Sequence, residues 1–184
     1  MAHFMNGFVA AVQLLQRVAE NGYLVEYVCL AASVIDGSLR LGLILQHQLK
    51  TQSAEVLDNL LLQTDGDQIV SERKLYRRAL REGVIDSTLS QDLEDLYTKR
   101  NRVVHRYIIS DLTTREVLKI ATEFERILPV VNAAVGALEA LQVERSVGMT
   151  RSGELPGLGR ALAEMSAEKH GDPHLATLLK SNGT

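Results

Sequence analysis

The sequence contains little cysteine and little proline, and both shortages narrow the possible structures. Cys29 is the one cysteine among 184 residues, which excludes an intrachain disulfide. It stands in an apolar run, and no cluster of Cys or His with metal-ligand spacing accompanies it, so we expect a buried thiol and neither a metal nor a cofactor. The prolines, Pro129, Pro156 and Pro173, are few enough to allow long helices.

The sequence also lacks a strong excess of one charge sign. The net charge is −3 with 23% charged residues, which is ordinary for a soluble globular protein. A protein that binds polyanions over its whole surface is therefore excluded, and any contact with nucleic acid needs a local basic patch. No Gly-rich phosphate loop and no Ser-based hydrolase elbow is present.

Signals for targeting and for membrane insertion are missing as well. The first residues, MAHFMNGF, have no basic region before an apolar core, so we expect no signal peptide. The longest apolar stretch, residues 23–45, contains Glu26, Asp36 and Arg40, and a membrane span strongly disfavours such charges. We interpret this stretch as the core helix of a cytoplasmic protein without membrane contact.

Apolar residues at helical spacing are abundant, whereas the alternation typical of strands is nearly absent. The spacing predicts helices over residues 6–20, about 23–49, from near 53 to before 65, 71–83, 89–108 and 113–143. In the first helix the residues expected to face inward are Phe8, Val12, Leu15 and Val18. The prediction is an all-α fold, an antiparallel bundle of four to five main helices over residues 1–145. Residues 146–184 begin with a stretch rich in Gly and Ser and are expected to form a linker and a helical or loose appendage.

Local signals predict where several helices begin and end. The pair Asn21-Gly22 should end the first helix, and Gly83 should end the fourth. Thr113 and Glu116 have the spacing of a capping box at the start of the last long helix. Pro129 is expected to kink that helix.

One stretch, YTKRNRVVHRY at residues 97–107, places a charge where helical packing would use an apolar side chain. The apolar stripe of this helix consists of Leu89, Leu93, Leu96, Tyr97, Val103, Val104 and Tyr107. Arg100 falls in its middle, although a guanidinium cannot lose its charge and is costly to bury unpaired. Arg100 therefore pairs with an internal carboxylate, extends outward to water, or faces a cleft between two subunits. The candidate carboxylates are Glu26 and Asp36 of the second helix, where Asp36 also has the spacing to pair with Arg40.

The segment from Arg100 to His105, RNRVVH, resembles the Arg-x4-6-His motif of the HEPN family (higher eukaryotes and prokaryotes nucleotide-binding domain). Arg100 matches the arginine of that motif, Asn101 the polar residue that often follows it, and His105 the histidine. Tyr107 extends the match to the RxxxxHxY form of HEPN toxins that are paired with nucleotidyltransferase antitoxins. The all-helical layout of residues 6–143 agrees with the family, and residues 146–184 lie outside the resemblance.

The resemblance implies a homodimer in which the two motifs meet, and a metal-independent endoribonuclease that acts on RNA. It implies the toxin of a toxin–antitoxin or phage-defence system, with a 2′,3′-cyclic phosphate and a 5′-hydroxyl as products. His105 would accept or donate a proton, Arg100 would bind the phosphate, and Asn101 would orient either of them.

Further residues would support this site. Arg102 and Arg106 flank the motif with positive charge, and Glu26 or Asp36 would hold Arg100 from the second helix. The resemblance also implies a possible antitoxin partner of the nucleotidyltransferase type, for which Tyr107 would be a target of nucleotidylation.

Structural interpretations remain open beside the functional ones. His105 could be a surface or capping histidine, Asn101 an exposed amide, and Tyr107 a core residue, which is the favoured interpretation of Tyr107. The basic residues spaced along 71–83, Arg73, Lys74, Arg77, Arg78 and Arg81, form either a solvated face or a surface that tracks phosphates. The alternative functions are a non-catalytic HEPN-like module that binds a nucleotide or a protein, and a helical regulatory protein without a role on RNA.

Overall fold

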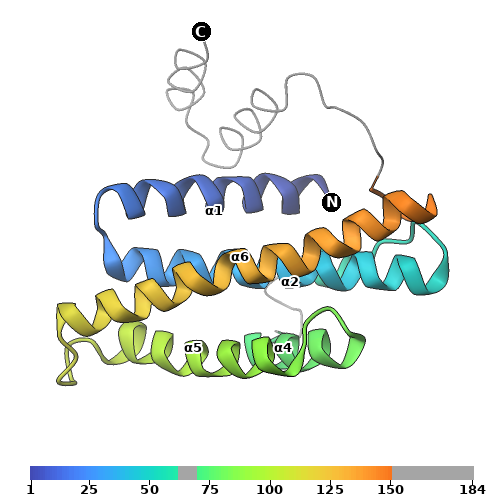
Figure 1. Cartoon of the computed structure of the whole chain (residues 1–184). Coiled ribbons are helices and arrows are strands. Elements are labelled where there is room, and N and C mark those ends of the chain that lie inside the picture. The colour runs from blue at the N-terminus through green and yellow to red at the C-terminus, as the bar shows by residue number, and fades with distance from the viewer. Residues whose placement is uncertain (62–69, 151–184) are drawn as a thin grey trace, which may run out of the picture.

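The structure is a computed structural model that describes residues 1–61 and 70–150, and every regular element in these ranges is a helix (Figure 1). The helices are α1 (Ala2–Glu20), α2 (Leu24–Thr51), α3 (Asp58–Leu61), α4 (Glu72–Glu82), α5 (Ser87–Arg106) and α6 (Thr114–Arg145). The predicted all-α bundle is confirmed. The predictions for residues 62–69 and 151–184 lie outside the described residues.

Helix α2 forms the centre of the bundle and contacts α1, α3, α4, α5 and α6. Figure 1 shows α1 on one side of α2 and α4 with α5 on the other, while α6 crosses α2 in the middle layer. Ile35, Leu39, Ile44 and Leu45 of α2 have no exposed surface. Burial of each such side chain stabilises the fold by about 1.5–3 kcal/mol, so α2 supplies much of the core.

Helices α2 and α6 are both long and apolar enough to cross a membrane, judged by length and composition. In the fold, 72% of the apolar window of α2 and 33% of that of α6 are buried inside the molecule. The burial of α2 agrees with the interpretation of residues 23–45 as a core helix. The cytoplasmic location stays a prediction.

The local signals end the helices where the sequence predicts. Asn21 ends α1, and Gly83 follows α4 with a left-handed φ of 79°, which glycine adopts without strain. At the start of α6 the backbone N–H of Glu116 donates to Thr113 Oγ1 at 3.3 Å, and the N–H of Thr113 donates to Glu116 Oε2 at 2.8 Å. Pro129 lies inside α6, and the kink expected there stays a prediction.

The helix predicted from Ser53 is wrong over its first residues, because helical structure begins only at Asp58. Gln52 ends α2 in the left-handed region, with φ 55°. The amide of Gln48 then donates to the carbonyl of Glu55 at 2.9 Å, which holds the intervening segment in a non-helical path. This bond comes from a buried side chain of another helix, so helical periodicity could not reveal it.

The inward face predicted for α1 is partly wrong. Val12 is 42% exposed, whereas Val9, Ala10 and Leu15 are buried. Helix α1 packs against α2.

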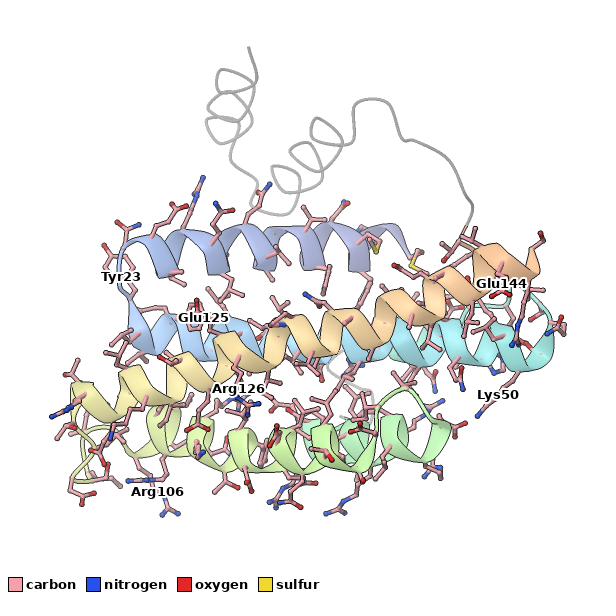
Figure 2. All side chains as sticks on the ribbon, in the orientation of Figure 1. Tyr23, Lys50, Arg106, Glu125, Arg126 and Glu144 are labelled. Atoms are coloured by element: carbon pink, nitrogen blue, oxygen red, sulfur yellow. The ribbon has the colours of Figure 1, made fainter. Side chains whose placement is uncertain are left out.

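Ion pairs at the surface connect the helices of different layers. Lys50 of α2 lies 3.0 Å from the carboxylate of Glu82 in α4. Arg126 of α6 lies 3.2 Å from the carboxylate of Asp92 in α5, and Figure 2 shows it between the two helices. Such exposed pairs contribute little to stability, so the arrangement of the helices depends on the apolar core.

Candidate functional site

A pocket of about 380 Å³ lies where α2, α4 and α5 meet, and Arg100 is part of its wall. The described residues around it are Ser33, Asp36, Val70, Ser71, Glu72, Tyr97 and Arg100. Asp86 positions α5 because its side chain accepts the backbone N–H of Leu89 at 2.8 Å and so caps the helix. Leu93 and Leu96 are buried on the same side of α5, so the guanidinium is carried toward the interior and its side chain is only 22% exposed.

Arg100 forms an internal ion pair, but its partner is Glu72 at the start of α4. Arg100 Nη2 donates to Glu72 Oε1, and Nη1 donates to the side-chain oxygen of Asn101 at 2.9 Å. Of the three possibilities left open for Arg100, the structure shows the internal ion pair, and neither of the two candidate partners, Glu26 and Asp36, forms it. Glu72 is 28 residues from Arg100 in the chain and on a separate helix, so only the packing of α4 against α5 reveals the pair.

Neither predicted carboxylate bonds to Arg100, and the two lie in different surroundings. Glu26 is exposed, and its charge acts on the thiol of Cys29. Cys29 is partly rather than fully buried, and burial is the main cause that raises the pKa of its thiol. Asp36 pairs with Arg40 at 2.5 Å, as the spacing predicts, and lines the same pocket as Arg100.

Glu72 and Tyr76 form a small polar group behind Arg100. The Tyr76 hydroxyl donates to Glu72 Oε2 at 3.5 Å. Burial raises the pKa of Glu72 above its usual 4.5, and the nearby charge of Asp36 acts in the same direction, against the lowering by Arg100. Burial and the charge of Glu72 also raise the pKa of Tyr76, so the phenol keeps its proton and acts as a donor.

His105 does not share this pocket. It lies exposed in the last turn of α5, without a hydrogen bond or an ion pair to any residue in the described ranges. Asn101 is partly buried and contacts Arg100 rather than His105. One chain therefore brings Arg100 and Asn101 together and leaves His105 outside.

The basic residues around the motif are exposed. Arg102 lies 3.8 Å from Asp111, and Lys99 pairs with Glu123 of α6. Arg106 is exposed at the end of α5, as Figure 2 shows. Carboxylates thus offset the charges of Arg102 and Lys99, and Arg106 adds positive charge beside His105 at the end of α5.

Tyr107 is 41% exposed, so the favoured prediction of core packing is wrong. Helix α5 ends at Arg106, and the chain turns there before α6 begins, so no helix covers the apolar residues that continue the stripe. Val104 is 40% exposed, Ile108 94% and Ile109 81%. We refer to Val104, Tyr107, Ile108 and Ile109 as the α5-end patch.

The basic row of α4 is largely paired with acidic groups. Arg73 lies 2.7 Å from the carboxylate of Glu94, with its guanidinium 5.0 Å from the ring centre of Tyr97. Arg77 lies 3.7 Å from the same carboxylate, and Arg81 pairs with the glutamate that follows it. This pairing favours the interpretation of the row as a solvated face.

No group of three or more His, Cys, Asp or Glu side chains that could hold a metal occurs in the part of the chain that the structure describes. No family model, no curated protein and no solved structure matches the chain. The likeness to the HEPN family therefore rests on the residues of the α5 motif and on the helical layout around it.

Proposed function

We propose that the chain is an HEPN-type, metal-independent endoribonuclease that acts as a homodimer, as the toxin of a toxin–antitoxin or phage-defence system in the cytoplasm. The observation that supports this most is the placement of the motif on α5. Arg100 points into a pocket, and His105 is exposed beside an uncovered apolar patch. An apolar residue at position 100 would continue the buried stripe of Leu96 and Val103, so packing alone does not explain the guanidinium.

A second copy of the chain would complete the site. Large apolar side chains that protrude together mark interaction surfaces, and the α5-end patch is next to His105 in the sequence. In a two-fold symmetric dimer each patch would face its own counterpart, so the two His105 side chains would approach one another. The groove between the copies would then hold a histidine from each copy and a nearby guanidinium.

The chemistry follows from these residue types. One His105 takes the proton of the RNA 2′-hydroxyl, whose oxygen attacks the adjacent phosphorus. The bond from phosphorus to the 5′-oxygen breaks, and the leaving oxygen takes a proton from the other His105. Arg100 stabilises the charge that builds on the phosphate oxygens, and Asn101 orients the guanidinium through its bond to Nη1. The products are a 2′,3′-cyclic phosphate and a 5′-hydroxyl.

The test is cleavage of total RNA in EDTA by the wild type and by the variants His105→Ala and Arg100→Ala. The wild type should cut, and each variant should cut at least about 100-fold more slowly, which is typical for loss of a general acid or base. His47→Ala is the matched control, because His47 lies on α2 beside Glu55, away from the motif, and this variant should cut like the wild type. Equal cutting by all proteins, or cutting by none, would contradict the proposal.

A nucleotidyltransferase-type antitoxin fits the same surface. The Tyr107 side chain is exposed, so a modifying enzyme could reach its hydroxyl in the monomer. A nucleotide attached there would place negative charge and bulk on the α5-end patch. This would prevent both dimer formation and RNA binding.

The alternative is a non-catalytic HEPN-like module that binds a nucleotide or a protein. The pairing of Arg100 with Glu72 favours the form of it that binds a protein, because an arginine that is already neutralised attracts a phosphate less strongly. The cleavage assay separates the two functions. The alternative predicts that the wild type cuts no RNA but still binds its nucleotide or protein ligand.

A further inference from the structure

The bonding of Arg100 leaves one of its three side-chain nitrogens, Nε, without a partner in the described part of the chain. Arg100 Nη2 bonds Glu72 and Nη1 bonds Asn101, but Nε is buried and has no hydrogen-bond partner in the described part of the chain. A carboxylate that gripped the Nε–Nη2 edge with both oxygens would satisfy Nε as well. Glu72 does not: its Oε1 accepts from Nη2, and its Oε2 accepts from the hydroxyl of Tyr76.

Glu72 also competes with other anions for the guanidinium. Each edge that can hold an oxyanion in a two-point grip includes Nη2, either with Nε or with Nη1, and Nη2 already donates to Glu72. The other charges of the pocket cancel, since Asp36 is paired with Arg40. Glu72 thus neutralises the remaining positive charge of the pocket, that of Arg100.

We propose that Glu72 is a built-in competitor for phosphate. It holds Arg100 in the free protein and leaves Nη2 when a phosphate group of a ligand takes the Nε–Nη2 edge with two oxygens. Such a ligand supplies the bond that Nε lacks. Glu72 therefore sets the affinity of the pocket for phosphate mono- and diesters. This inference rests on the proposed function only where it takes an RNA phosphate as the natural ligand.

The competing interpretation is that Glu72 simply ties α4 to α5. Leu75 and Ala79 of α4 and Leu93 and Leu96 of α5 are buried, and α4 packs against α5, so the ion pair is not needed for that contact. A purely structural tie predicts that loss of the carboxylate lowers stability and leaves phosphate binding unchanged.

The test is the binding of inorganic phosphate to the full chain, measured by calorimetry at constant ionic strength. Glu72→Gln should bind phosphate about tenfold more tightly than the wild type, because a freed charge-assisted hydrogen bond is worth at least that factor. Adding Arg100→Ala to this variant should abolish the gain. The matched control is Glu82→Gln, which removes the same charge from the exposed end of α4 and should change affinity less than twofold. Equal phosphate affinity in the wild type and Glu72→Gln would overturn the proposal.

A second measurement needs no change at Glu72. In wild type labelled with ¹⁵N at arginine, the Nε signal of Arg100, identified by its loss in Arg100→Ala, should shift on addition of phosphate. An unchanged signal at saturating phosphate would also overturn the proposal. Phosphate binding does not depend on RNA cleavage, so this proposal and the ribonuclease proposal fail separately.

Discussion

At the scale of the residue, Arg100 is held by a carboxylate that stability alone does not require. A buried ion pair is often no more stable than apolar side chains of the same volume, because both ions lose their hydration. Arg100 sits between Leu96 and Val103, which are buried, so a leucine at this position would extend the same stripe. The guanidinium, its unbonded Nε and the carboxylate opposite it are more consistent with a binding site than with packing.

The raised pKa of Glu72 predicts how the free energy of unfolding depends on pH. Because the folded state holds the Glu72 proton more tightly than the unfolded state, the protonated carboxyl contributes stability below its usual pKa of 4.5. That contribution is lost as the pH rises through the raised pKa of the folded state. The free energy of unfolding of the wild type minus that of Glu72→Gln should therefore fall with rising pH and then level off. Urea denaturation at several pH values from about 4 to 8 measures it, and a difference that grows with pH would contradict the prediction.

At the scale of the element, Gly42 makes possible a close approach of α6 and of the segment after α4 to α2. A Cβ built on Gly42 would lie 2.7 Å from Val84 Cγ1, in the segment after α4, and 3.2 Å from Val135 Cγ2 of α6, so neither neighbour leaves room for a side chain here. Glycine in a helix costs up to about 1 kcal/mol relative to alanine. The fold accepts this cost because it brings α6 close to α2.

The change Gly42→Ala should therefore destabilise the protein by about 1–3 kcal/mol, since overpacking outweighs the gain in helix propensity. Gly136→Ala in α6 is the matched control, because nothing lies within 4 Å of a Cβ at that position. It should stabilise the protein by about 0.5–1 kcal/mol. Urea denaturation of both variants checks the pair, and a Gly42→Ala protein as stable as the wild type would refute the expectation.

The sequence predicts features that depend on residues within one helix better than contacts between helices. Helices such as α4 and α6 could be predicted because Gly83 and the Thr113–Glu116 box act within a few residues of the helix end. The error after Ser53 and the missed Glu72–Arg100 pair share a different cause. Both depend on a side chain of one helix that reaches another segment of the chain, through Gln48 and Glu72. Spacing within one helix contains no information about such contacts.

The exposure of Tyr107 was unpredictable for a related reason. The apolar stripe of α5 continues in the sequence beyond Val103, but coverage depends on where the chain turns toward α6. The motif from Arg100 to His105 could be recognised from the sequence. The separation of its two ends, one in a pocket and one in solvent, could not.

At the scale of the whole molecule, the two ends of the bundle differ in character. At one end Gln48 and Gln142 are fully buried, and their amides bond one another and the backbone of Met149 and Thr150. The side-chain oxygens of Gln48 and Gln142 both accept hydrogen bonds from within the chain. At the opposite end of α6 in Figure 1, where α5 finishes, the α5-end patch leaves large apolar side chains in solvent. A partner that covers this patch would gain apolar burial that the monomer does not supply.

If that partner is a second copy, the double variant Ile108→Asp with Ile109→Asp should be monomeric where the wild type is dimeric. Both side chains are almost wholly exposed in one chain, so the change should leave the melting temperature of the monomer nearly unaltered. Two charges that face each other across a symmetric interface should weaken the dimer at least about 100-fold, because central apolar contacts carry most of the binding free energy. Sedimentation velocity over a range of concentrations measures the dissociation constant.

Val130→Asp is the control, since Val130 is an exposed apolar residue of α6 outside the patch. This variant should remain dimeric. A wild type that stays monomeric at every concentration, or a double variant that still dimerises, would contradict the dimer and with it the groove in which two His105 side chains act on one phosphate.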